Sequence, residues 1–155
     1  MSLADRNYTP QQAEFVSLLR EFAAGAVLFN QRVAERVGLH ATDLQCANLL
    51  YLLGPSTPGR LAEYTGLTTG GVTVMLDRLE KAGYIKRVAN PDDRRSVLVR
   101  VSAKKMEKLD EHYAGVSAQL EAFLKSVSEA ELAVALKFFR HINAIRISAA
   151  MGEPR

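Results

Sequence analysis

The chain has only one cysteine, little net charge and no long hydrophobic run. Its one cysteine, Cys46, cannot form an internal disulfide, which is typical of a reducing compartment and predicts a cytoplasmic location. No segment reaches the roughly 18–20 consecutive apolar residues that a membrane-spanning helix needs, so we expect no membrane partner. The first ten residues are polar and predict no secretory signal. With 48% apolar and 24% charged residues, the composition predicts one globular domain over residues 1–155.

The net charge of +3 is unevenly distributed. Residues 78–105 contain nine basic and three acidic residues, an excess of six positive charges, whereas the rest of the chain has an excess of three negative charges. A basic block in an otherwise acidic chain is typical of proteins that bind polyanions. A solvated basic surface is the alternative, and the position of the block within the fold has to decide between the two.

A long helix is predicted at the start of the chain, over residues 9–38. Thr9 and Gln12 form a T-x-x-Q capping box, Pro10 suits the first helical position, and Gly38 ends the helix. At about 1.5 Å per residue such a helix is roughly 40 Å long and overhangs a small core, so we expect it to bind a partner. Its apolar residues form one stripe at spacings of three and four: Phe15, Leu18, Leu19, Phe22, Ala26, Phe29, Val33 and Val37.

Three short helices are predicted next, at residues 42–53, 57–66 and 68–82. Thr42 and Gln45 form a second capping box at the start of the first. A glycine lies at or just after the end of each helix, as is typical of helix ends. After the third glycine the apolar pattern alternates, and it predicts two strands, 84–88 and 96–101, joined as a hairpin by a charged turn.

Two long helices are predicted at the C-terminal end, within residues 102–150. Ser102 caps the first, and Ser128 and Glu131 form an S-x-x-E capping box at the start of the second. The apolar arc of the second helix is too broad for one side of a monomer, so we expect a symmetric homodimer held by residues 9–38 and 102–150. The first helix has a seam of three heptads: Met106, Leu109, Tyr113, Val116, Leu120, Phe123 and Val127.

Two short helices joined by a tight turn and followed by a hairpin predict a winged helix-turn-helix over residues 42–101. The predicted fold is therefore mainly α with a small β-hairpin, flanked by long N- and C-terminal dimerisation helices. In this motif the second short helix enters the major groove of DNA. Val72, Met75, Leu76 and Leu79 share one face of that helix and should pack on the core, and the opposite face carries Gly70, Thr73, Val74, Asp77, Arg78 and Lys81.

The start of this helix and the hairpin turn supply further DNA-binding candidates. Thr68 and Thr69 lie where backbone amides and the helix dipole attract phosphate. Gly70 and Gly71 each cost the helix up to about 1 kcal/mol relative to alanine, so we expect close approach to DNA, with a loose first turn as the alternative. In the turn, Arg94 and Arg95 can reach a minor groove and Asp93 can orient an arginine, unless the turn is simply solvated. The predicted DNA-binding set is Thr68, Thr69, Gly70, Gly71, Thr73, Val74, Arg78, Arg94 and Arg95, with Asp93 as orienter.

The run LAEYTGLTTGGVTVMLDRLEKAGYIKR, followed by NPDDRRSVLVRVS, resembles the DNA-binding lobe of the MarR family of transcriptional regulators. In that family a D-x-R element of the wing, matched here by Asp93 and Arg95, holds an arginine that enters the minor groove. The resemblance implies a homodimeric DNA-binding regulator, expected to be a repressor, that binds a near-palindromic operator on double-stranded DNA. It also implies release by a small-molecule effector, phenolic or aromatic in type, near Phe22, Ala26, Asn48, Tyr51 and Tyr113.

Other chemistry is less well supported by the sequence. Cys46 is interpreted as a buried small residue rather than a thiol switch. The three histidines are scattered without carboxylate or cysteine at ligand spacing, so we expect no metal and no cofactor. A winged-helix module that docks an acidic protein is the second hypothesis. An enzyme is the third, and the lack of a nucleophile, base and orienter set predicts that the chain is not one.

Overall fold

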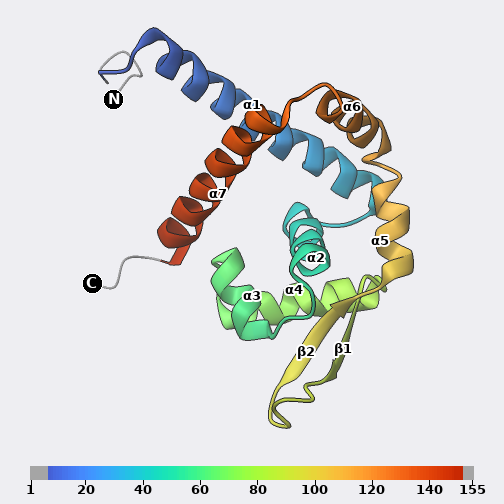
Figure 1. Ribbon diagram of the computed structural model, residues 1–155. Helices are drawn as coiled ribbons and strands as arrows, with labels where there is room; N and C mark the ends of the chain where they lie inside the picture. The colour runs from blue at the N-terminus through green and yellow to red at the C-terminus, as the bar shows by residue number, and fades with distance from the viewer. Residues whose placement is uncertain (1–6, 152–155) are drawn as a thin grey trace. The chain divides into compact units, whose positions relative to one another are not determined.

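The computed structural model describes residues 7–151, with side chains up to residue 145, so the predicted domain limits at residues 1 and 155 lie outside the described residues. The described residues are mainly helical with one small sheet, as predicted (Figure 1). None of the described helices is long and apolar enough to cross a membrane. The elements are α1 (Pro10–Val37), α2 (Ala41–Leu53), α3 (Pro58–Thr65), α4 (Thr69–Lys81), β1 (Ile85–Ala89), β2 (Val97–Val101), α5 (Ala103–Asp110), α6 (Ala114–Leu124) and α7 (Glu129–Met151).

The chain divides into two compact units, and the first, up to Leu44, contains α1. The predicted capping box is present: Thr9 Oγ1 accepts from the Gln12 N–H at 3.3 Å, and Gln12 Oε1 accepts from the Thr9 N–H at 2.9 Å. At the other end Gly38 adopts the left-handed conformation with φ 69°. Both predicted boundaries of α1 are therefore confirmed.

The second helix starts within one residue of its predicted start, but the predicted capping box of Thr42 and Gln45 is wrong, because α2 begins at Ala41 and Thr42 lies inside its first turn. The end of α1 explains this. The Gly38 N–H donates to the Glu35 carbonyl at 3.2 Å and the Leu39 N–H donates to the Ala34 carbonyl at 2.9 Å, the paired bonds of a Schellman motif. This motif uses the two residues after α1, so α2 starts almost at once and Thr42 cannot act as its N-cap.

In the second unit, α3 and α4 form the helix-turn-helix. Thr57 Oγ1 caps α3 by accepting from the Arg60 N–H at 3.3 Å, and Gly66 ends it at φ 69°. Thr68 caps α4, and Gly83 after it is left-handed with φ 77°. Each of these predicted helix ends is confirmed to within one residue.

The hairpin is antiparallel and runs from Ile85 paired with Val101 to Ala89 paired with Val97. Its two strands extend beyond α3 and α4 to a projecting turn (Figure 1). The middle of β2 is fixed by a bridge that the sequence does not suggest. The Ser56 N–H donates to the Val99 carbonyl at 3.2 Å, and the Val99 N–H donates to the Ser56 carbonyl at 2.9 Å. The loop before α3 thus holds β2 where Val99 is fully buried.

The single long helix predicted after the hairpin is wrong, since α5 and α6 are separate helices. Between them the His112 and Tyr113 N–H groups donate to carbonyls three residues back, at 3.0 and 2.9 Å, so the chain tightens into a 3₁₀-type turn. The apolar spacing of three and four continues through this turn, and periodicity therefore cannot detect the break. Ser102 occupies the N-cap position of α5, but its side chain makes no capping bond.

The capping box of the last helix is confirmed. The Ser128 N–H donates to Glu131 Oε2 at 2.9 Å, and the Glu131 N–H donates to Ser128 Oγ at 3.3 Å. The hydrogen bonds from the Ser128 side chain and backbone lower the pKa of the Glu131 carboxyl. Together these bonds fix where the chain turns from α6 into α7.

Candidate nucleic-acid interface

Helix α4 has two chemically opposite faces. The four apolar residues predicted to face the core are all buried, each with 1% or less of its surface exposed. The polar face is exposed, as predicted, and includes an apolar residue, Val74, with 55% of its surface exposed. A helix fixed by one complete apolar face presents the other as a rigid surface. On α4 and at its N-cap, the exposed residues of the predicted DNA-binding set are Thr68, Thr69, Gly70, Thr73, Val74 and Arg78.

The N-terminal end of α4 has one amide capped by its own chain. Thr68 Oγ1 accepts from the Gly71 N–H at 3.1 Å. The N–H groups of Thr69 and Gly70 belong to the first turn, whose amides have no partner within a helix. An exposed helix N-terminus of this kind favours an anion such as phosphate.

The two glycines of α4 are in different surroundings. A Cβ on Gly71 would lie 3.3 Å from Thr68 Oγ1, so the missing side chain leaves room for the cap. A Cβ on Gly70 would have no atom within 4 Å. The fold therefore gives a reason for glycine at position 71, and it gives none at position 70.

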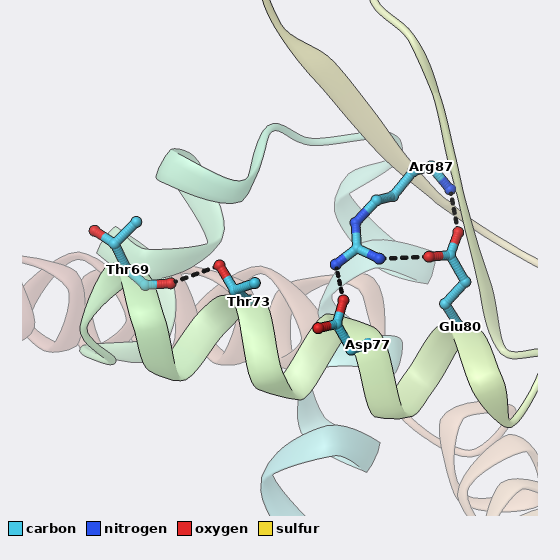
Figure 2. Close-up of polar contacts among 5 residues, drawn as sticks. All are labelled: Thr69, Thr73, Asp77, Glu80 and Arg87. Carbon is cyan, nitrogen blue, oxygen red and sulfur yellow. Dashed lines mark hydrogen bonds and ion pairs between the residues drawn. The ribbon is translucent and has the colours of Figure 1, made fainter.

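Thr73 bonds back to its own helix. Its hydroxyl donates to the Thr69 carbonyl at 3.0 Å, as Figure 2 shows. Because this bond uses the hydroxyl proton, the exposed side chain presents its oxygen lone pairs and its methyl group outward. Both are groups that can contact base edges in a major groove.

The wing turn between β1 and β2 is held by its own hydrogen bonds. Asn90 Nδ2 donates to Ser96 Oγ at 2.8 Å, and the Asp92 N–H donates to Asn90 Oδ1 at 3.1 Å. The Ser96 N–H donates to the Asp93 carbonyl at 3.0 Å. Such bonds reduce the freedom of the turn before any ligand binds, so its exposed side chains start from a defined backbone.

Asp93 acts on Arg95 through the backbone. Asp93 Oδ1 accepts from the Arg95 N–H at 3.0 Å, a bond that restrains the backbone from which the Arg95 side chain leaves the turn. The sequence predicts that Asp93 orients an arginine, and the donor of its bond is the backbone N–H of Arg95. Arg94 and Arg95 are both exposed. The orienting role of Asp93 stays a prediction, with the backbone N–H of Arg95 as the contact.

Sequence reasoning missed the role of Arg87. Figure 2 shows its guanidinium between two carboxylates of α4: Nη2 lies 2.7 Å from Asp77 Oδ1, and Nη1 bonds Glu80 Oε2. The Arg87 N–H also donates to Glu80 Oε1 at 3.0 Å. The backbone and side-chain hydrogen bonds from Arg87 lower the pKa of the Glu80 carboxyl. Two acids three residues apart on one helix were the available signal, because that spacing puts them on one face.

The predicted effector residues have different degrees of exposure, and their role stays a prediction. Phe22 and Tyr51 are 64% and 49% exposed, and Ala26, Asn48 and Tyr113 are half-buried. Cys46 is fully buried, as expected for a small core residue. Within residues 7–145 no group of three or more potential metal ligands is found.

Comparisons with known proteins agree with this geometry. A family model described as the MarR family matches residues 39–97. The "Uncharacterized HTH-type transcriptional regulator YcgE" of Bacillus subtilis is 37% identical over 123 residues, which cover 79% of this chain and 80% of YcgE. The transcriptional regulator Tm0710 from Thermotoga maritima shares the fold with a TM-score of 0.62 and 22% identity, over 85% of this chain and 93% of its own. A mutant of Escherichia coli MarR complexed with operator DNA has a TM-score of 0.54 and 21% identity, over 83% and 93%.

Proposed function

Because this chain belongs to the MarR family of transcriptional regulators, we propose that it represses transcription as a homodimer on a near-palindromic DNA operator. The observation that carries the proposal is the two-faced helix α4 beside an arginine-bearing wing. One face of α4 is wholly buried and the other is exposed and polar, which suits a helix that enters a major groove. The complex of Escherichia coli MarR with operator DNA supports it.

Each part of this surface has a separate task in the proposal. Thr73, Val74 and Arg78 contact base edges in the major groove. Thr68 and Thr69 hold a phosphate at the start of α4, and Gly70 lets the DNA approach closely. Arg95 enters the minor groove and Arg94 contacts a phosphate, so the wing adds shape recognition to the base contacts of α4.

Large apolar side chains on the surface of the single chain support the homodimer. On α6, Val116, Leu120 and Phe123 are 55%, 54% and 63% exposed, and on α7 Phe139 is 51% exposed. Exposed apolar side chains grouped on helix surfaces are typical of protein–protein contacts. A two-fold dimer presents two copies of α4, which predicts operator half-sites about one helical turn apart.

The regulatory part of the proposal is an effector that releases the DNA. In the cytoplasm, an aromatic small molecule bound near Asn48 and Tyr113 would favour dimers whose two α4 helices do not match the operator spacing. Such a ligand can lower the DNA affinity by no more than the ratio of its affinities for the released and the DNA-binding forms of the dimer.

Duplex binding as a function of salt tests the proposal. We expect the protein to select a duplex from a random pool and to bind it about a thousandfold more tightly than a scrambled duplex. Several phosphate contacts should make the affinity fall steeply between about 50 and 200 mM salt. A duplex affinity that does not change with salt concentration, or tighter binding to an acidic protein than to any duplex, would contradict the proposal and favour a protein-docking module.

Gly70→Ala should stabilise the protein and weaken its DNA binding. Alanine favours the helix by up to about 1 kcal/mol, and the added Cβ meets no atom within 4 Å apart from the adjoining residues and backbone of its own helix. On the DNA side that Cβ would separate α4 from the duplex, so we expect a several-fold loss of operator affinity beside a raised unfolding midpoint. Thermal unfolding and duplex titration measure the two effects.

Gly59→Ala is the matched control for this substitution. Gly59 is the second residue of α3, as Gly70 is of α4, and its Cβ would also meet no atom within 4 Å. The control should stabilise the protein without a change in operator affinity. If Gly70→Ala binds the operator as tightly as the wild type, the glycine reflects only a loose first turn.

A further inference from the structure

We infer that Arg87 is a positioning residue that holds the wing at a fixed angle to the recognition helix, so that α4 and Arg95 reach their two grooves together. The inference rests on the proposed function. Arg87 belongs to β1, and its partners Asp77 and Glu80 belong to α4. Three bonds join the two elements: one to Asp77 at 2.7 Å and two to Glu80, one of them from the Arg87 backbone N–H at 3.0 Å.

Arg87 lies midway along β1, between the buried start of the hairpin and its exposed end. At the base of the hairpin, Ile85 is buried and the neighbouring Tyr84 N–H donates to the Leu79 carbonyl at 2.9 Å. Further out, Ala89 and its partner Val97 are exposed. Arg87 pairs with Val99, where β2 is bridged to Ser56. The bonds of Arg87 therefore hold β1 to α4 at the level where the hairpin leaves the core. A small rotation of the hairpin about this level displaces the tip of the wing further than it displaces Arg87.

Charge gives a second reason for the arrangement. Asp77 is exposed, with 62% of its side-chain surface accessible, and lies one turn after Thr73 on α4. A carboxylate near a DNA-facing surface is repelled by phosphates. The Arg87 guanidinium lies against that carboxylate with only 27% of its side chain exposed, so it offsets the repulsion while it fixes the strand. Its planar fork suits two carboxylates at once, which the single ammonium of lysine does not.

Arg87→Lys tests the inference, because it keeps the charge and removes the fork. The probes are the duplex that the wild-type protein selects from a random pool and a scrambled duplex of the same composition. We expect a loss of affinity for the selected duplex about as large as that caused by Arg95→Ala, with a salt slope shallower by about one counterion. The affinity for the scrambled duplex should change by no more than about twofold. Arg100→Lys is the matched control, since Arg100 is exposed on the neighbouring strand, and it should change neither affinity.

The decisive measurement is the effect of Arg95→Ala in each background. With Arg87 present, Arg95→Ala should weaken binding of the selected duplex by about 5- to 150-fold. With lysine at position 87 the same substitution should cost less than about threefold, because a wing that is no longer aligned has already lost that contact.

Other outcomes overturn the inference in distinguishable ways. In one such outcome, Arg95→Ala weakens binding equally in both backgrounds, while Arg87→Lys only lowers the unfolding midpoint. In that case Arg87 stabilises the fold without aligning Arg95, and the proposed function stands. If Arg95→Ala does not change the affinity of the otherwise wild-type protein for the selected duplex, Arg95 makes no contact that Arg87 could align, and the inference is wrong. If the wild type selects no duplex at all, the proposed function fails, and the inference fails with it.

Discussion

Phe123→Glu on α6 is expected to separate the proposed homodimer and to remove tight operator binding. Phe123 is 63% exposed on the single chain and shares one side of α6 with Leu120, which is 54% exposed. A carboxylate there would have to be buried without a partner when two subunits meet, a large cost. Because a dimer gains its affinity from two half-sites, the monomer should bind the operator roughly 100- to 10,000-fold more weakly. Sedimentation equilibrium and duplex titration measure both effects.

Ala118→Glu is the matched control, since it adds the same charge on the opposite side of α6. That side carries the exposed ion pair of Lys125 with Glu121, at 2.8 Å, and should face solvent in the dimer. The control should remain dimeric and bind the operator. A dimeric Phe123→Glu protein with unchanged operator affinity would show that α6 is not part of the contact.

The wild-type protein offers a test of the dimer that needs no variant. If the subunit is barely stable alone, folding and association are linked, and the midpoint of thermal unfolding should rise with protein concentration. A midpoint that is constant from nanomolar to micromolar protein, together with a stable monomer in sedimentation, would contradict an obligate dimer.

The sequence predicts well those features that a few neighbouring residues determine. The capping box of Thr9 and Gln12 and that of Ser128 and Glu131 are both present, because each needs only a hydroxyl and a side chain three residues later. The two faces of α4 are also as predicted. A period of 3.6 residues is enough to separate a buried apolar face from an exposed polar one.

Features that depend on distant or competing contacts were not predicted. Thr42 has the chemistry of an N-cap, but the Schellman motif at Gly38 makes α2 start before it. The turn at His112 and Tyr113 interrupts a helix without disturbing its apolar spacing. The pairing of Arg87 with Asp77 and Glu80 requires the chain to reverse at Gly83. A count of charges along the sequence cannot detect this pairing, and it therefore included Arg87 among the basic residues expected to attract a polyanion.

In the wing, Arg95→Ala should weaken operator binding by about 1–3 kcal/mol and reduce the salt dependence by about one counterion. It should also relax any preference for A·T pairs beside the half-site, because a narrow minor groove is where an inserted arginine is most favoured. Arg94→Ala is the control from the same turn. As a proposed phosphate contact, its loss should weaken all duplexes alike.

The sign of the effect of Asp93→Ala decides whether this acid orients Arg95. Removal of a negative charge near phosphate should by Coulomb's law tighten binding. If Asp93 aligns Arg95, binding should weaken instead, because the turn loses the 3.0 Å bond to the Arg95 N–H and must be ordered on binding. Asp93→Asn separates the two effects, since its amide oxygen can still accept that bond without the charge, and it should bind at least as tightly as the wild type. The double substitution of Asp93 and Arg95 by alanine should be about as weak as Arg95→Ala alone. If Asp93→Ala binds the operator more tightly at every salt concentration, the acid is only a solvated turn residue and the orienting contact has no role in recognition.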